Sequence, residues 1–160
     1  MNTPTLSIYH ANSKRTGSAL KVALVKPQPI EGTDDFESGR FEFTLASQAE
    51  NRGLFPSFDW DDGITFRLTF RSAANVLAVF RGIYETIDNG KGLVDSGISG
   101  GSVQLRLSHI LEPREGYKLE ISRCGDACDP ITIQIYLTEA EALGLNLAME
   151  ASLGEMAFGA

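Results

Sequence analysis

The feature that most constrains this chain is a strand-and-helix unit that occurs twice. Residues 64–85, ITFRLTFRSAANVLAVFRGIYE, alternate apolar and polar side chains and then change to apolar spacings of three and four. This change predicts a strand that runs directly into an amphipathic helix. Residues 131–152, ITIQIYLTEAEALGLNLAMEAS, repeat the pattern 67 residues later (131 − 64). Two copies of one unit predict internal pseudo-two-fold symmetry.

The first copy divides into a strand and a capped helix. Alternation places four apolar side chains on one face of the strand: Ile64, Phe66, Leu68 and Phe70. We assign Phe66 and Phe70 to the core, together with Phe41 and Phe43 of an earlier strand. Ser72 is the predicted N-cap. The helix that follows carries one apolar stripe: Ala73, Val76, Leu77, Phe80 and Tyr84.

Further strands precede each copy. In the first half the candidates are residues 5–10, 18–26 and 40–46, with an acidic loop at 30–39. In the second half they are residues 103–111 and 117–124, after a Gly-rich linker at 88–101. The predicted class is α+β, with two antiparallel four-stranded sheets each followed by a helix (ββββα-ββββα). We expect one domain, 1–160, with halves at about 5–86 and 101–158.

The predicted second helix, about residues 139–153, is apolar on more than one face. The segment Thr138-Glu139-Ala140-Glu141 matches a capping box at its start. The apolar residues of the helix are Ala142, Leu143, Leu145, Leu147, Met149 and Leu153. Because a small domain rarely covers so wide an apolar surface alone, we expect burial at an oligomer interface.

Composition argues against several classes of protein. No apolar run approaches the roughly 20 residues of a membrane span, and no basic, apolar leader opens the chain, so we expect a cytoplasmic protein, with nucleoid association as an option. Cys124 and Cys128 fit a reducing compartment, and their role stays open. His10 and His109 are isolated, so neither a metal or other cofactor nor a catalytic constellation is expected, and we do not expect an enzyme.

The net charge of −7 argues at first against a nucleic-acid partner, but the charges are polarised along the chain. Residues 1–30 carry four cations and no acid, whereas residues 124–160 carry six acids and no lysine or arginine. The net value therefore says little about any one face.

A few short motifs then occur in a recognisable order. Phe58-Asp59-Trp60 precedes the first strand-and-helix unit, residues 17–22 (GSALKV) form an early strand, and Thr138–Glu141 opens the last helix before the apolar end Met156–Gly159. In this order the chain resembles the Whirly family of single-stranded-nucleic-acid-binding proteins and the related coactivator and kinetoplast guide-RNA-binding proteins. The early strand departs from the family's Lys-Gly-Lys-Ala-Ala-Leu, since Thr16 and Ser18 replace the flanking lysines. The resemblance implies two roughly perpendicular sheets, helices at the centre of a tetramer, and strands that radiate outward to bind single strands.

Binding single strands without reading their sequence needs cations for the phosphates and aromatic faces for the bases. The candidate residues are Lys14, Arg15, Lys21, Lys26, Arg40, Arg52, Phe55, Arg67, Arg71, Arg106 and Lys118. Five of them lie on polar faces of predicted strands and would line one surface with the N-terminal cations: Arg40, Arg67, Arg71, Arg106 and Lys118. Alternatively, such cations form surface ion pairs with Glu42 and Glu120 and only keep the protein soluble. Phe55 is the better stacking candidate, whereas Trp60 is expected to be structural.

The favoured hypothesis is a Whirly-like homotetramer that binds single-stranded DNA, or RNA, with low sequence preference in DNA maintenance or transcription. In the second copy of the repeat, Gln134 and Thr138 stand where the first has Arg67 and Arg71. We therefore expect the first half to carry more of the binding. The alternative is an acidic protein-interaction scaffold of the same fold without nucleic-acid affinity.

Overall fold

The computed structural model describes residues 4–50, 54–95, 101–125 and 130–159. The first sheet has the order β1-β2-β5-β6 and contains β1 (Thr5–His10), β2 (Ser18–Val25), β5 (Arg40–Ser47) and β6 (Ile64–Leu68). The second sheet has the order β10-β9-β8-β7 and contains β7 (Leu93–Asp95), β8 (Gly101–Ile110), β9 (Gly116–Gly125) and β10 (Ile131–Thr138). A short hairpin joins β3 (Gln28–Pro29) and β4 (Phe36–Glu37), and the helices are α1 (Phe70–Phe80), α2 (Glu139–Phe158) and the 3₁₀ turn η1 (Ile87–Gly90).

The α+β class is confirmed, because each half contains a four-stranded antiparallel sheet whose last strand runs into a helix. The repeat is only approximate. The β3–β4 hairpin interrupts the first half, and α1 has 11 residues where α2 has 20. The helix caps, Thr69 and Thr138, are separated by 69 residues (138 − 69) rather than 67, since five strand residues precede the first cap and seven precede the second.

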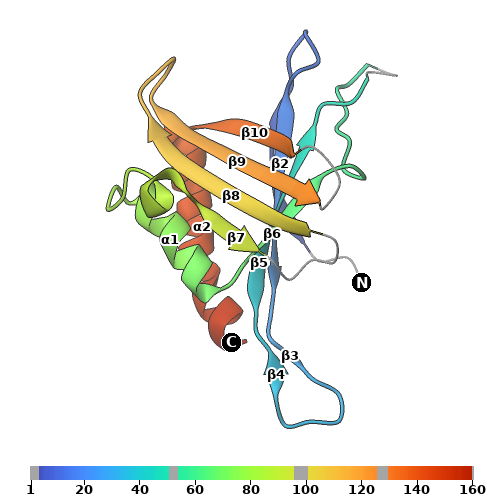
Figure 1. Cartoon of the computed structure of the whole chain (residues 1–160), viewed down its shortest axis with the longest axis vertical. Coiled ribbons are helices and arrows are strands. Elements are labelled where there is room, and N and C mark those ends of the chain that lie inside the picture. The colour runs from blue at the N-terminus through green and yellow to red at the C-terminus, as the bar shows by residue number, and fades with distance from the viewer. Residues whose placement is uncertain (1–3, 51–53, 96–100, 126–129, 160) are drawn as a thin grey trace.

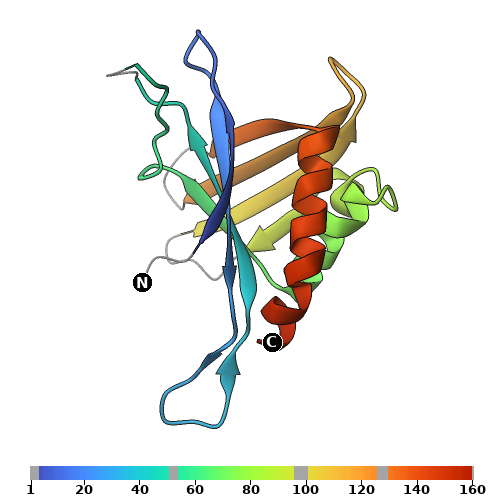
Figure 2. The same ribbon diagram turned by 180° about the vertical axis from the view of Figure 1, so that it is seen from behind.

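The two sheets and the two helices enclose one apolar core. The strands of the sheets cross each other steeply, and both helices lie on the same side of the second sheet (Figures 1 and 2). Strand β6 contacts β8 and β9, β10 contacts β2 and β5, and α1 packs against α2. The largest fully buried side chains come from both halves: Leu20, Phe43, Leu45, Ile64, Phe66, Leu68, Ile87, Leu105, Leu107, Leu119, Ile121 and Ile135. Burial of these side chains is the main favourable contribution to folding.

The junction between β6 and α1 differs from the sequence prediction. Thr69, not Ser72, is the N-cap: its backbone is extended (φ −71°, ψ 176°) and its hydroxyl accepts a hydrogen bond from the Ser72 amide. Phe70 is therefore the first residue of the helix, and with 56% of its surface exposed it is not a core residue. The strand alternation stops at Leu68 because a helix turns successive side chains by about 100°. Tyr84 also lies outside the stripe, since α1 ends at Phe80.

Residues 88–95 are not the plain linker that the glycines suggested. Ile87 is buried in η1, and Leu93–Asp95 form the edge strand β7, which pairs with β8. The acidic loop at 30–39 likewise contains the short β3–β4 hairpin. Two- and three-residue strands are too short to show alternation, so the fourth strand of the second sheet was missed.

The capping box at the start of α2 is confirmed. The Thr138 hydroxyl accepts a hydrogen bond from the Glu141 amide (3.1 Å), and the Glu141 carboxylate accepts one from the Thr138 amide (2.9 Å). The helix continues past the predicted end near residue 153 to Phe158 and closes with Gly159 in the left-handed region (φ 80°). Leu143 and Leu147 are 58% and 55% exposed, so α2 keeps an apolar face outside the core.

Within the described residues, neither helix combines the length and the apolar character that crossing a membrane requires.

Candidate nucleic-acid interface

The β1–β2 turn presents Lys14 and Arg15 at one end of the first sheet. The buried Gln48 holds the base of the turn: its carbonyl oxygen accepts hydrogen bonds from the amides of Asn12 (3.0 Å) and Gly17 (3.3 Å), and its NH₂ group donates to the Asn12 carbonyl (3.2 Å). Glycine is needed at position 17 because any Cβ would collide with the carbonyl oxygen of His10. The fold thus places two exposed cations at the tip of a well-anchored turn.

An aromatic cluster lies on the face of the first sheet that Lys21 occupies. The loop after β5 returns to this sheet through a β-bridge between Gln48 and Phe58. The ring of Phe58 lies 5.5 Å from that of Tyr9 and 6.4 Å from that of Trp60, between centroids. Lys21 Nζ lies 4.0 Å from the Trp60 ring centroid, which is cation–π geometry. Tyr9 is 58% exposed, so part of the cluster faces solvent.

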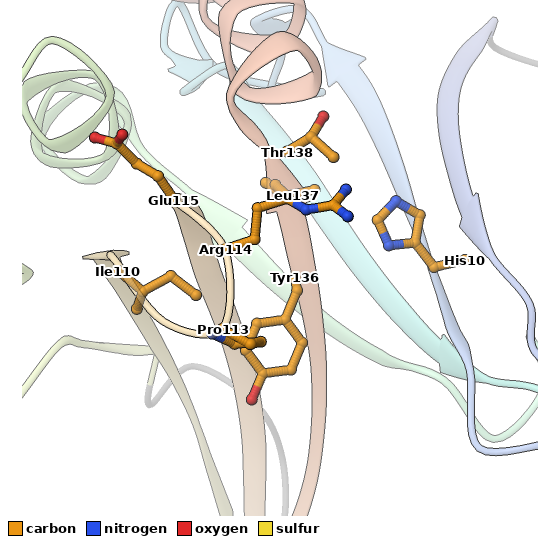
Figure 3. A pocket seen from close by; sticks show the side chains of 8 residues that line it. All are labelled: His10, Ile110, Pro113, Arg114, Glu115, Tyr136, Leu137 and Thr138. Atoms are coloured by element: carbon orange, nitrogen blue, oxygen red, sulfur yellow. The ribbon is translucent and has the colours of Figure 1, made fainter.

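A pocket of about 350 Å³ opens where the end of β1 approaches the β8–β9 turn and β10. Figure 3 shows the Arg114 guanidinium extending toward His10, with the Tyr136 ring beside Pro113. His10 Nε2 is 2.8 and 2.9 Å from the two carboxylate oxygens of Glu141, which ties β1 to the start of α2. The pocket therefore offers one cation and one partly exposed aromatic ring.

These features share one end of the molecule. The β1–β2 turn, the loop after β5 and the β8–β9 turn point the same way, and the β3–β4 hairpin points the opposite way (Figure 1). We call this region the three-loop end; its cations and aromatic residues are Lys14, Arg15, Lys21, Arg114, Tyr9, Phe55, Phe58, Trp60 and Tyr136. Acidic residues occupy the same loops: Asp59, Asp61, Asp62, Glu112 and Glu115. The three-loop end is thus of mixed charge, and one of its cations, Lys21, lies against an aromatic ring.

The predicted cations are distributed over both sheets and α1. Arg71 belongs to α1 rather than to a strand, and Lys26 follows β2 and lies 3.5 Å from Glu155 of α2. Arg106 and Lys118 lie on the second sheet, whereas Arg40 and Arg67 lie on the first. Phe55 is 81% exposed, as a stacking residue would need to be. Arg52 lies outside the described residues.

Four predicted cations are paired with acidic side chains, as expected if their role is solubility rather than binding. The Arg40 side chain lies 2.8 Å from Glu42, Lys118 lies 2.8 Å from Glu120, and Lys26 pairs with Glu155. Arg67 donates two hydrogen bonds of 2.8 Å to Asp95, joining β6 to β7. These bonds raise the pKa of both Arg67 and Lys118. Five of the predicted cations form no ion pair with a described residue: Lys14, Arg15, Lys21, Arg71 and Arg106.

The sequence did not point to every residue of the three-loop end. Tyr9 and Arg114 were not singled out, and treating the histidines as isolated was wrong, because each one contacts a glutamate. The alternation of Tyr9 with Ser7 was the one available signal, since it places Tyr9 on the polar side of its strand. His10 and Glu141 are 131 residues apart, a separation that leaves no local pattern.

Glu141 makes the stability of this region depend on pH. Burial opposes its ionisation, but the hydrogen bonds from Thr138 and His10 outweigh burial and hold its pKa below the ordinary value of 4.5. A carboxyl with a lowered pKa adds stability above its unfolded-state pKa, and this stability is lost as the pH falls through its folded-state pKa. We expect the unfolding free energy of the parent protein to exceed that of Glu141→Gln at about pH 7, and the difference to shrink by about pH 3.5. Urea denaturation at both pH values measures this difference, with the half-buried Glu155 replaced by Gln as the control. An equal difference at the two pH values would contradict the expectation.

The arrangement of the elements is that of the Whirly fold. The solved structures that resemble this chain include the crystal structure of WHY1 from Arabidopsis thaliana, with a TM-score of 0.74, 20% identity, and coverage of 99% of this chain and 88% of that one. They also include WHY3 from the same plant, with a TM-score of 0.72, 19% identity, and coverage of 98% and 89%. The structure of the plant transcriptional regulator PBF-2 is similar as well. Its TM-score is 0.71 and its identity 19%, with coverage of 98% of this chain and 83% of that chain. These identities establish the fold alone.

A fourth similar structure is that of a guide-RNA-binding protein complex bound to a guide RNA. Its TM-score is 0.63 and its identity 14%, with coverage of 96% of this chain and 92% of that chain. No protein-family model and no curated protein sequence matches this chain. The similarity is therefore one of fold.

Proposed function

We propose that this protein binds single-stranded nucleic acid at the three-loop end, with DNA preferred over RNA and little preference for sequence. The observation that carries the proposal is the cluster of Tyr9, Phe58 and Trp60 with Lys21 on the Trp60 ring. Sequence-independent binding of single strands combines stacking faces with nearby cations in this way. Two similar folds, a transcriptional regulator and a complex bound to guide RNA, support the same class of ligand.

The net charge of the protein limits the affinity for nucleic acid that we expect. A chain of net charge −7 repels a polyanion at long range, so binding depends on the few cations of the three-loop end. Four such cations have no ion-pair partner among the described residues: Lys14, Arg15, Lys21 and Arg114. If all four contact phosphates, the slope of log K against log salt is about −3, since each contact on a single strand contributes about −0.7.

We propose that the protein binds nucleic acid as a homotetramer whose subunits contact each other through α2. We also propose that the two halves of each chain are divergent copies of one ββββα unit. One face of α2 combines exposed leucines with exposed small residues: Ala140, Leu143, Gly144, Leu147, Ala151 and Gly154. The spacing of three and four residues makes this a single stripe, and small residues let a second helix approach closely. The role is non-catalytic, in DNA maintenance or transcription, and the cytoplasm, including a nucleoid, is the proposed location.

Fluorescence anisotropy of a labelled oligo-dT at low and moderate salt tests the binding. Lys21→Gln should weaken it and reduce the salt slope by about 0.7. Lys26→Gln, one residue past the end of the strand that carries Lys21, is the matched control, since Lys26 is already paired with Glu155, and it should leave both quantities unchanged. An oligo-rU of equal length measures the preference for DNA. Absence of binding at micromolar protein in low salt would remove the proposal.

A second candidate function is an acidic protein-interaction scaffold of the same fold. Two observations favour it: four of the predicted cations are neutralised by acids, and α2 exposes an apolar stripe. This function predicts a stable oligomer in light scattering together with no salt-sensitive binding of oligo-dT. Light scattering and the anisotropy titration therefore separate the two functions.

A further inference from the structure

Three side chains that can coordinate a metal meet beside the β8–β9 turn, at the edge of the pocket that Glu115 helps to line. They are His109 near the end of β8, Glu115 in the turn, and Glu139 at the first position of α2. One donor atom from each lies within 4.8 Å of the other two, and His109 Nε2 is 3.2 Å from Glu115 Oε1. We propose that these three residues form a binding site for a zinc ion.

The backbone and the histidine ring are already held in place. The His109 ring packs edge-on against Tyr117 (5.3 Å between centroids), and Tyr117 packs edge-on against Phe80 (5.2 Å). The His109 amide donates to the Glu85 carbonyl (2.9 Å). The capping box at the start of α2 holds the backbone of Glu139 in place. A site whose supporting contacts exist before binding loses less conformational freedom when the ion arrives.

Only the two carboxylates need to move. Donors bound to zinc at about 2.0–2.2 Å lie roughly 3.3–3.6 Å from each other in a tetrahedron, compared with the present limit of 4.8 Å. Glu115 and Glu139 are both exposed, so rotation of their side chains brings the oxygens closer without disturbing the core. Water completes the tetrahedron as the fourth ligand.

The charges at this point suit a divalent cation. Two carboxylates and a neutral imidazole balance the charge of one zinc ion. Glu139 forms no ion pair with a described residue, and Arg114 does not compete, because Figure 3 shows its guanidinium pointing toward His10 while Glu115 points the other way. The local field is therefore negative before any ion binds.

The donor set favours zinc over the hard cations. Calcium takes six to eight oxygen ligands, and magnesium keeps most of its water and an octahedral shell, so two carboxylates and an imidazole suit neither ion well. Imidazole together with carboxylate is a common zinc donor set. A bound ion would link the end of β8, the β8–β9 turn and the start of α2, all of which border the pocket that contains Arg114 and Tyr136.

Calorimetric titration of the full chain with zinc chloride, after removal of metals with a chelator, tests the site. Cys124→Ser and Cys128→Ser are included in every sample so that thiols cannot take the ion. We expect one zinc ion per chain and a higher melting temperature. His109→Ala and Glu139→Gln should each weaken zinc binding at least about tenfold.

His10→Ala is the matched control, because His10 also contacts a glutamate but belongs to no group of three donors among the described residues. It should leave zinc binding unchanged. Glu139→Gln alters an exposed residue in the first helical turn, so it still tests the site if His109→Ala fails to fold. Absence of zinc binding, binding insensitive to Glu139→Gln, loss of binding in His10→Ala, or displacement of zinc by millimolar calcium would each overturn the proposal.

Discussion

Replacing Phe66 by alanine is expected to lower the free energy of unfolding by about 3–5 kcal/mol, the usual range for a phenylalanine lost from a core. Phe66 is 1% exposed and pairs with Phe43 in the first sheet, on a strand that also contacts β8 and β9. The cavity would therefore open between the two sheets. The total free energy of unfolding of a small domain is roughly 5–15 kcal/mol, so the variant should lose much of its stability.

Phe70→Ala is the matched control for this prediction. Phe66 and Phe70 are four residues apart, and strand alternation puts them on the same face, yet Phe70 starts α1 and is 56% exposed. We expect Phe70→Ala to cost less than about 1 kcal/mol. Urea denaturation followed by circular dichroism measures both variants. Similar losses for the two variants would contradict the helix boundary at residue 70.

Removing Trp60 is expected to weaken oligo-dT binding about 5- to 150-fold, because stacking on an aromatic side chain is worth roughly 1–3 kcal/mol per base. The substitution also removes the ring on which Lys21 rests, so both the stacking face and the position of one cation are lost. Trp60→Phe keeps a ring at this position and should recover part of the affinity. Anisotropy titration at fixed salt measures these effects, with circular dichroism confirming that each variant is folded.

Phe36→Ala provides the comparison for Trp60. Phe36 is 65% exposed on the β3–β4 hairpin, at the opposite end of the molecule from the three-loop end (Figure 1). Its removal should not change the affinity for oligo-dT. Trp60 is also the single tryptophan of the chain, so its fluorescence should be quenched as the oligonucleotide binds. Binding without a change in tryptophan fluorescence, or an equal loss of affinity in Phe36→Ala, would place the ligand elsewhere.

Most strands and both helices could be predicted from local pattern. The alternation of residues 40–46 and 131–137 and the capping box at Thr138–Glu141 involve neighbours in sequence, so they are visible without the fold. The errors fall where local pattern is ambiguous or absent. Phe70 satisfies both the strand alternation and a helical position, and β7 is recognisable as a strand only by its pairing with β8.

The candidate site was predicted less well, for a different reason. Strand alternation correctly places Arg40 and Arg67 on a polar face, but it does not say which acid lies beside them. The Asp95 that binds Arg67 is 28 residues away in sequence, on the other sheet. Whether a cation is neutralised or available to a phosphate is therefore decided by which strands meet, not by the strand that carries it.

The sequence by itself determined the two sheet-and-helix halves, the capped start of α2 and the apolar excess of that helix. These features depend on hydrogen bonds and side-chain periodicity over a few residues. The tertiary structure alone decided that Tyr9, Phe58 and Trp60 form a cluster under Lys21, that His10 meets Glu141, and that His109 meets two glutamates. Each of these groups joins segments distant in sequence, and the crossing of the two sheets sets the distances between those segments.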